Sequence, residues 1–360
     1  MAATPALLIH AGPLARAWLR EHGLRAQDVR VVPAAAGGPK GLVLNPLDRF
    51  LFGHWLHDAP QILHLLGASI GAWRMACACM PNADAALTEM AEDYITQRYE
   101  HAQGKPPKAR HISEVFGRKL DQRLGARAAE VLAHPTRRLH VFTSRGRHLL
   151  SRQGRLRTPL GYAGAFVANA AGRRALGGWI ERVVFSDPRE RLPFALSDFR
   201  STQSPLAAGN LSAAVLASCS IPFWLDAVHD IPGGPRGAYW DGGITDYHLH
   251  LPYGDMAQGL VLYPHFQDTV VPGWLDKPWK RRHLATSALD NVVVLSPSPA
   301  WVKTLPSGKL PDRGDFKAYG DDDAARIKVW RLALAQSQRL ADEFADMVAH
   351  GGGIESLPLR

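Results

Sequence analysis

The order of apolar runs along the chain constrains its fold more than any other feature. Short runs typical of β-strands alternate with longer runs of helical period. The strand-like runs lie at residues 29–36, 61–66, 138–143, 182–185, 259–263 and 291–295. The helix-like runs lie at residues 42–56, 70–80, 85–99, 113–133 and 321–350. This alternation is typical of a mainly parallel sheet covered by helices, so we predict an α/β fold.

Nothing in the sequence divides the chain into separate domains. It contains no long Gly/Ser-rich linker, and 360 residues are within reach of one large α/β domain. We expect a single domain over residues 1–360, with a motif-bearing core at about 28–255 and a basic helical segment at 105–157 inside that core. The C-terminal extension, residues 256–360, is expected to end in one closing helix at 321–350.

The segment Gly67-Ala-Ser-Ile-Gly71 fits the G-x-S-x-G nucleophile elbow. In this motif a serine occupies a strained turn between a strand and a helix, and small flanking residues such as Gly67 and Gly71 let the backbone make that turn. The expected strand leads directly into the motif and the expected helix leads directly out. Ser69 is therefore predicted to lie at the carboxyl edge of the sheet, beside a helix N-terminus that favours an anion.

A second glycine-rich loop, Gly37-Gly-Pro-Lys-Gly41, follows the first expected strand. Adjacent glycines let backbone N–H groups converge on an anion without a side chain in the way. The spacing matches neither the Walker loop nor the dinucleotide-binding fingerprint. An acyl hydrolase needs an oxyanion hole, and this loop could supply it. Pro39 has no N–H, so the candidate donors are Gly37, Gly38 and Lys40, with Ile70 as a further one.

A serine nucleophile also needs a base. In Trp240-Asp-Gly-Gly243 an aspartate precedes two residues without side-chain bulk, so Asp241 could approach another loop closely. The chain also has 16 histidines, which makes the presence of a histidine uninformative by itself.

In this order, the three signals resemble the patatin-like phospholipase family. The family pattern is G-G-x-[RK]-G, then G-x-S-x-G, then D-G-[GA], and Ala217-Ser-Cys-Ser-Ile-Pro222 resembles its A-S-x-A-x-P segment. Family loops often begin D-G-G-G, whereas Ala35-Ala36 stands here where Asp-Gly would be. The resemblance covers about residues 28 to 255, and it implies the patatin-like three-layer fold, a mainly parallel sheet with helices on both faces.

The resemblance further implies a serine acyl hydrolase that cleaves lipid carboxylic esters through a Ser–Asp dyad and an acyl-enzyme intermediate. Ser69 would attack the ester carbonyl while Asp241 takes its proton. Gly37 and Gly38 would hold the oxyanion, and Lys40 would secure the loop or add positive charge. No cofactor and no metal is expected. The class of lipid ester, the acyl-chain preference and the oligomeric state are left open.

Two other functions stay open at this point. An α/β-hydrolase-type esterase would use a Ser-Asp-His triad, completed by His250 or His265. A non-catalytic protein on a hydrolase fold would bind a membrane or a partner instead. The pairs His229-Asp230 and His248-x-His250 lack a third and a fourth ligand at metal spacing, so we expect no metal site there.

The positive charge of the chain is concentrated in one segment. The formal net charge is +9, but residues 105–157 hold fourteen Lys or Arg and three acids, which leaves −2 for the remainder. A local cationic segment suits peripheral contact with an anionic membrane. Nucleic acid is not expected as a partner, because the segment has few aromatic residues and no zinc or helix-turn-helix spacing.

The sequence also favours a cytoplasmic location. Three cysteines cannot form a disulfide framework, and the N-terminus lacks the basic region of a signal peptide. The longest uncharged run, residues 201–225, contains prolines, a glycine and five serines, unlike a membrane span. We therefore expect a cytoplasmic protein, peripheral at the membrane, without a transmembrane segment.

Overall fold

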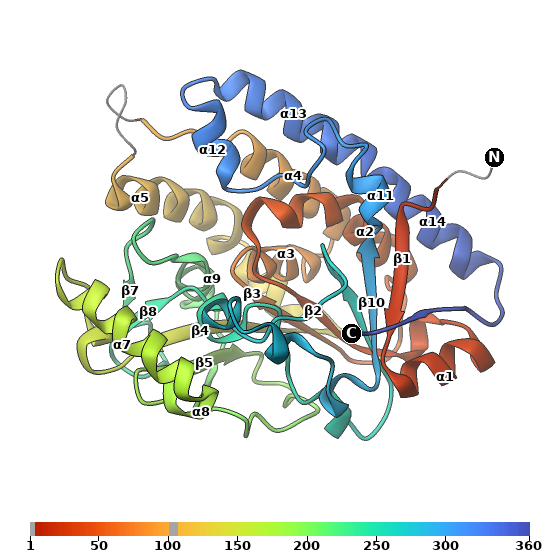
Figure 1. Cartoon of the computed structure of the whole chain (residues 1–360), viewed down its shortest axis with the longest axis horizontal. Helices are drawn as coiled ribbons and strands as arrows, with labels where there is room; N and C mark the ends of the chain where they lie inside the picture. The colour runs from red at the N-terminus through yellow and green to blue at the C-terminus, as the bar shows by residue number, and fades with distance from the viewer. Residues whose placement is uncertain (1–3, 101–106) are drawn as a thin grey trace.

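A computed structural model describes residues 4–100 and 107–360 (Figure 1). An eleven-stranded sheet runs through this part of the chain in the order β11-β1-β10-β9-β2-β3-β4-β5-β6, with β8 beside β4 and β7 beside β8. The strands are β1 (Leu7–Ala11), β2 (Val29–Ala34), β3 (Leu63–Ala68), β4 (Arg137–Gly146), β5 (Ile180–Ser186), β6 (Ser201–Pro205), β7 (Val228–His229), β8 (Ala238–Trp240), β9 (Leu260–Pro264), β10 (Val292–Pro297) and β11 (Leu357–Pro358).

The centre of the sheet is parallel. Strands β10, β9, β2, β3 and β4 all run in one direction. On either side of them, β1 pairs antiparallel with β10, and β5 pairs antiparallel with β4. All six expected strands are present, with ends displaced by at most three residues. The α/β prediction is thus confirmed, and parallel strands place their carboxyl ends, including those of β2 and β3, at one edge.

Each face of the sheet packs against its own apolar core. On β10, Val293 and Leu295 belong to one core, while Val292 and Val294 belong to the other. This alternation follows from the two-residue period of a strand. The first core also receives α1, α2, α3, α4 and α9, and the second receives mainly loops and short helices from residues 192–199 and 249–270.

The helices surround the sheet, and Figure 1 shows the C-terminal pair α13 and α14 beside α4 and α2. The helices are α1 (Pro13–His22), α2 (Asn45–Phe50), α3 (Ile70–Ala78), α4 (Ala83–Ile95), α5 (Ala109–Leu120), α6 (Ala128–Ala133), α7 (Arg157–Ala171), α8 (Arg173–Leu176), α9 (Leu211–Cys219), α10 (Gly243–Asp246), α11 (Pro299–Val302), α12 (Gly314–Tyr319), α13 (Asp323–Gln336) and α14 (Gln338–Ala349).

Two helix expectations need correction. The helix expected at 113–133 is divided into α5, which begins at Ala109, a π-helical turn at Asp121–Gly125, and α6. Ser113 is not the N-cap, because it lies inside α5 and its hydroxyl accepts a 2.7 Å hydrogen bond from the Asp226 N–H. The single closing helix expected at 321–350 is two helices that meet at Ser337. The Ser337 hydroxyl bonds to the Ala333 carbonyl at 2.7 Å, a local bond that competes with regular helix geometry.

The C-terminal extension takes part in the sheet. Residues 256–360 supply β9, β10 and β11, and β9 lies between β10 and β2. The loops that leave β9 and β10 therefore start at the same edge as the glycine loop after β2. In the part of the chain that the structure describes, no helix is both long enough and apolar enough to cross a bilayer.

Candidate active site

Ser69 lies in the turn between β3 and α3, with a backbone φ of +56°. Residues other than glycine rarely adopt this left-handed conformation, so the turn is strained. Its flanking glycines are required by close packing: a Cβ on Gly71 would lie 1.9 Å from the Ala34 carbonyl oxygen, and one on Gly67 would lie 2.4 Å from Ala72 Cα. The local geometry is that of a nucleophile elbow.

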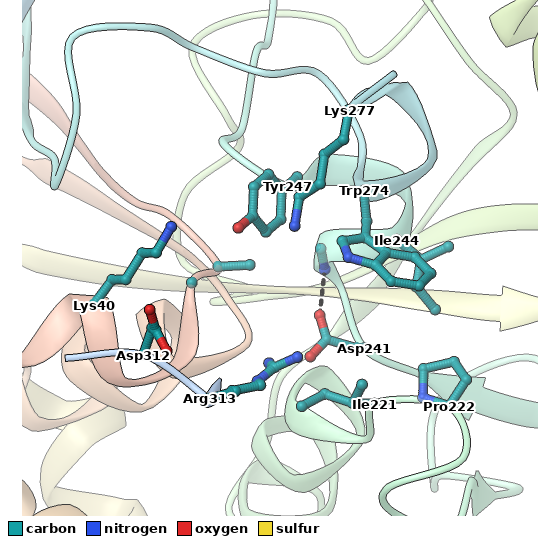
Figure 2. Close-up of a pocket in the computed structure, with 13 residues that line it drawn as sticks. Lys40, Ile221, Pro222, Asp241, Ile244, Tyr247, Trp274, Lys277, Asp312 and Arg313 are labelled. Carbon is teal, nitrogen blue, oxygen red and sulfur yellow. Dashed lines mark hydrogen bonds between the residues drawn. The ribbon is translucent and has the colours of Figure 1, made fainter. Parts of the chain in front are cut away.

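Ser69 and Asp241 are brought into direct contact although they are 172 positions apart in the chain. Ser69 Oγ donates a 2.7 Å hydrogen bond to Asp241 Oδ2. The second carboxylate oxygen, Oδ1, accepts a 2.7 Å bond from the Gly243 N–H (Figure 2). Both residues are buried, with exposed fractions of 3% for Ser69 and 6% for Asp241. A buried hydroxyl is thus aligned with a buried proton acceptor, which is the arrangement that general-base activation of a nucleophile requires.

The surroundings of Asp241 tune its basicity. Burial is the largest influence, and it raises the pKa of the Asp241 carboxyl above its ordinary value. The nearby Arg313 guanidinium opposes this rise, as do the hydrogen bonds from Ser69 and Gly243 and the more distant Lys277 ammonium. The net result is a stronger base than an exposed aspartate.

The C-terminal end of α9, with the residue that follows it, holds both members of the pair. Ser218 Oγ accepts a 2.8 Å bond from the Ser69 N–H and donates a 2.6 Å bond to the Phe142 carbonyl of β4. The Ser218 carbonyl accepts from the Gly242 N–H at 3.0 Å, and the Ser220 carbonyl accepts from the Asp241 N–H at 2.9 Å. Ser218 thereby ties the turn that carries Ser69 to the turn that carries Asp241.

The glycine loop lies beside the elbow. Gly38, Ser69 and Ile70 line one small cavity of about 60 Å³. Within the described residues, the N–H groups of Gly37 and Gly38 donate to no protein acceptor. Gly38 has a φ of +57°, which glycine alone adopts without strain. The geometry thus leaves two N–H donors without an acceptor among the described residues: that of Gly38, which lines the cavity of the candidate nucleophile, and that of Gly37, one residue earlier.

Lys40 differs from the two glycines. It lies within the short 3-10 helix Gly38–Leu44. Its side chain instead lines a larger cavity of about 170 Å³, which also contains Asp241 (Figure 2). Lys40 can therefore contribute charge to the site through its ammonium group.

Two functional candidates were not found from the sequence. Lys277, in the loop after β9, and Arg313, in the loop after β10, line the same 170 Å³ cavity. Both lie beyond the last recognised motif, in a region where no pattern marks them. Only the sheet order, which places β9 next to β2 and β10 next to β9, brings these loops to the candidate active site.

A third cavity, of about 160 Å³, adjoins the small cavity that contains Ser69. It shares Ile221, Leu225 and Arg313 with the small cavity that contains Ser69. Its described lining is largely apolar and aromatic: Tyr94, Tyr99, Pro107, Ile112, Ile221, Trp224, Leu225 and Phe316. Such a lining suits a hydrocarbon chain.

The histidines of the triad alternative lie elsewhere. His265 is fully buried, its Nδ1 contacts the Gln267 carbonyl, and burial lowers its pKa to about 3. The pKa of His250 is lowered to about 4, again mainly by burial. In the described part of the chain no histidine hydrogen-bonds to Ser69 or Asp241, and no group of three potential metal ligands converges. The triad alternative thus gains no support from the geometry.

Much of the positive charge in 105–157 is already used inside the protein. Asp93 accepts bonds from Lys119 at 2.9 Å and from Arg123 at 2.7 Å. Arg137 is buried and donates to the Phe52 carbonyl at 2.7 Å. Further pairs are Arg110–Glu114, Arg127–Glu130 and Arg145–Glu181. Lys105 lies outside the described residues. The segment is therefore a much weaker cationic surface than its composition indicates.

Comparisons with known proteins support the sequence resemblance. The model of the patatin-like phospholipase family matches residues 53–248, more than half of the chain, and the match includes Ser69 and Asp241. No curated protein matches significantly in sequence. Among solved structures, VipD from Legionella pneumophila is similar at 12% identity and a TM-score of 0.39, over 95% of this chain and 71% of VipD. The type III effector protein ExoU is similar at 14% identity and a TM-score of 0.27, over 87% of this chain and 53% of ExoU.

Proposed function

Because this chain belongs to the patatin-like phospholipase family, whose members are lipid acyl hydrolases, we propose that it cleaves lipid carboxylic esters through a Ser69–Asp241 dyad. The observation that carries this proposal is the 2.7 Å hydrogen bond from Ser69 Oγ to the buried Asp241 carboxylate. We also propose that the whole chain forms one domain, which is supported by a single sheet with strands from residue 7 to residue 358.

In the first half of the reaction, Ser69 Oγ attacks the ester carbonyl carbon as its proton passes to Asp241. A tetrahedral intermediate forms, and its oxyanion accepts bonds from the free N–H groups of Gly37 and Gly38. The N–H of Ile70, at the N-terminus of α3, is a third donor on the same cavity. The intermediate collapses to an acyl-enzyme, and the proton on Asp241 leaves with the alcohol.

In the second half, Asp241 accepts a proton from water, and the resulting hydroxide attacks the acyl carbonyl. The second tetrahedral intermediate uses the same N–H donors. It collapses to a free carboxylic acid and returns the proton to Ser69 Oγ. The acyl chain occupies the apolar cavity bounded by Ile112, Trp224 and Leu225 throughout.

We propose that the protein is cytoplasmic and makes peripheral contact with an anionic membrane, through a smaller surface than the full 105–157 segment. The surface consists of Arg152, Arg155, Leu156, Phe223 and Trp224, all exposed, and we call it the docking surface. Neither arginine forms an ion pair with a described residue. Two hydrogen bonds of Gln153, to Asp226 and to the Ala227 N–H, hold its two parts together.

The docking surface also borders the active site. Pro222 and Trp224, on either side of Phe223, line two of the cavities described above. Phe223 is 62% exposed and Leu156 is 72% exposed, an unusual position for large apolar side chains unless they meet an apolar phase.

Replacing Arg152 and Arg155 by Gln is expected to weaken binding to vesicles rich in phosphatidylglycerol. The control is Lys108→Gln and Arg118→Gln, which lie on or next to α5. Equal loss in both double variants would contradict the assignment.

A fluorophosphonate probe tests the hydrolase proposal directly. The wild-type protein is expected to be labelled, and peptide mass spectrometry is expected to place the adduct on Ser69. Absence of labelling in the folded protein would favour a non-catalytic binding protein. Labelling that persists in Asp241→Asn but is lost in His250→Ala or His265→Ala would favour a triad.

A further inference from the structure

Three cations from distant parts of the chain converge beside the proposed dyad. Lys40 comes from the glycine loop, Lys277 from the loop after β9, and Arg313 from the loop after β10, and all three line the 170 Å³ cavity with Asp241 (Figure 2). A single water needs only about 10–15 Å³ of such space, so the cavity has room for a larger group. We call Lys40, Lys277 and Arg313 the cationic cluster.

Among the described residues, the cationic cluster has no ion-pair partner. None of its three side chains forms an ion pair or a side-chain hydrogen bond with a described residue. The nearest acids are otherwise engaged, since Asp312 pairs with Lys309 at 2.7 Å and Asp241 accepts from Ser69. The closeness of the three cations to one another is unfavourable. Partial burial, with Arg313 and Lys40 nearby, lowers the pKa of the Lys277 ammonium to about 8. A bound anion would relieve this repulsion.

The loop that carries Lys277 is fixed by the residue before it. The fully buried Asp276 accepts hydrogen bonds from Asn169 at 2.9 Å, Arg282 at 2.8 Å and Arg173 at 3.1 Å. Because three donors hold Asp276, the backbone of this loop is fixed, and Lys277 stays beside the cavity.

The loop that carries Arg313 is fixed in a similar way. Asp315 accepts from Lys309 at 2.6 Å, from the Trp330 indole at 2.9 Å and from the Asp312 N–H at 3.0 Å. Arg313 itself is close to the glycine loop, because a Cβ on Gly38 would lie 3.1 Å from its Nε. The cationic cluster is therefore preorganised, as binding of an anion requires.

We propose that the cationic cluster binds the phosphate of an anionic glycerophospholipid while the acyl ester lies at Ser69. The inference rests on the proposed hydrolase function and adds the substrate class. A phosphate group offers several oxygens to a guanidinium and two ammonium groups, which is the pairing that Arg and Lys provide best. The headgroup would occupy the polar cavity and the acyl chain the apolar cavity, with Ser69 between them.

The same geometry disfavours a choline headgroup. Recognition of a quaternary ammonium relies on the faces of aromatic rings. In this cavity the Lys277 ammonium already lies 4.0 Å from the centre of the Tyr247 ring and 5.8 Å from that of Trp274. A choline group would have to displace Lys277 and remain close to Lys40 and Arg313. Phosphatidylglycerol and phosphatidic acid carry no such cation.

Headgroup preference is the kinetic test. Phosphatidylglycerol and phosphatidylcholine with identical acyl chains are presented in mixed micelles of one neutral detergent. The wild type is expected to show at least about tenfold higher kcat/KM for phosphatidylglycerol, equivalent to about 1.4 kcal/mol. Lys277→Gln is expected to lose most of this preference, and the matched control Lys280→Gln, an exposed lysine three residues away, to keep it. Equal rates for the two lipids in the wild type, or a full preference in Lys277→Gln, would overturn the proposal.

A binding measurement separates this inference from the hydrolase proposal. Calorimetry with Ser69→Ala is expected to detect sn-glycerol 3-phosphate, with at least about fivefold weaker binding when Lys277→Gln is added. A protein that cleaves no ester yet binds glycerol 3-phosphate through Lys277 would retain the site and lose the function. A protein that hydrolyses esters but does not bind glycerol 3-phosphate would retain the proposed function and lose the headgroup site. Inorganic phosphate that binds as tightly as glycerol 3-phosphate would overturn the assignment to a lipid headgroup.

Discussion

The backbone N–H of Ser69 donates a 2.8 Å hydrogen bond to the hydroxyl oxygen of Ser218, a residue 149 positions away. The Ser218 hydroxyl donates a 2.6 Å hydrogen bond to the Phe142 carbonyl, so one hydroxyl satisfies two buried backbone groups. Because Ser69 is held in a left-handed conformation, an anchor on its N–H fixes the direction of its Oγ. Ser218 is in this sense a positioning residue for the proposed nucleophile.

Replacing Ser218 by alanine is expected to lower kcat for a p-nitrophenyl ester by about 10- to 100-fold, because small displacements of a nucleophile have effects of this size. KM is expected to change less than about twofold, since the cavities keep their lining. Steady-state kinetics measure the two values, and Ser212→Ala, in the first turn of α9, is the control. A loss confined to thermal stability, with kcat unchanged, would show that Ser218 has a structural role only.

Removing either member of the proposed dyad is expected to lower hydrolysis of a p-nitrophenyl acyl ester by about 10³-fold or more, since catalytic groups that act as a unit cannot replace one another. The variants are Ser69→Ala and Asp241→Asn, measured with circular dichroism as a check of the fold. Asp241→Asn with wild-type activity would exclude Asp241 as the base. In the double variant the loss is expected to be no greater than in the more impaired single variant.

The pH dependence of kcat/KM is expected to report the ionisation of Asp241. Only the carboxylate can accept the Ser69 proton, so kcat/KM falls as pH decreases through the Asp241 pKa. Because burial raises this pKa, the acid limb is expected at higher pH than the ordinary aspartate value of 3.8.

Arg313 lowers the same pKa, which gives the pH profile a specific test. Arg313→Gln is expected to move the acid limb further toward neutral pH, whereas the exposed Arg281→Gln is expected to leave it in place. A neutral ester is the substrate, so that only the enzyme titrates. An acid limb that is identical in wild type and Arg313→Gln would contradict the electrostatic contact between Arg313 and Asp241.

Gly71→Ala tests the packing of the elbow against β2. The added methyl group would lie 1.9 Å from the Ala34 carbonyl oxygen, and backbone atoms cannot retreat without moving a central strand. We expect a loss of about 3 kcal/mol or more in the free energy of unfolding, or an insoluble product. Gly172→Ala is the control, since its methyl group would meet nothing within 4 Å. Equal urea midpoints for wild type and Gly71→Ala would refute the close contact.

The central strands and the order of the motif-bearing turns could be predicted from the sequence because they depend on local signals. A buried strand, a glycine turn and a helix are encoded within about twenty residues around Ser69. The fold class and the family were predicted correctly in this way. The break at Ser337 was not, because a hydroxyl that bonds within one turn leaves the apolar period of the helix unchanged.

The charges around the site could not be predicted for a different reason. Lys277 and Arg313 reach the cavity only because β9 pairs with β2 and β10 pairs with β9, and strand order is a long-range property. For residues 105–157 the sequence instead predicts more exposed positive charge than the structure has. Its acidic partners Asp93 and Glu181 lie outside the segment, so a local count of charges overlooks them.

In the proposed function, bond cleavage and headgroup recognition belong to separate parts of the chain. The motif-bearing turns carry the first, and the loops that follow β9 and β10 carry the second. The elbow and the aspartate turn are constrained by contacts such as that of Gly71 with Ala34, whereas Lys277 and Arg313 project from loops outside the recognised motifs. In the proposed function, substitutions at Lys277 and Arg313 can therefore change the headgroup preference while Ser69 and Asp241 keep their positions, although both cations also lower the pKa of Asp241. Proteins with identical motifs could thus divide the lipids of a single membrane among themselves, each diverging through a handful of loop residues.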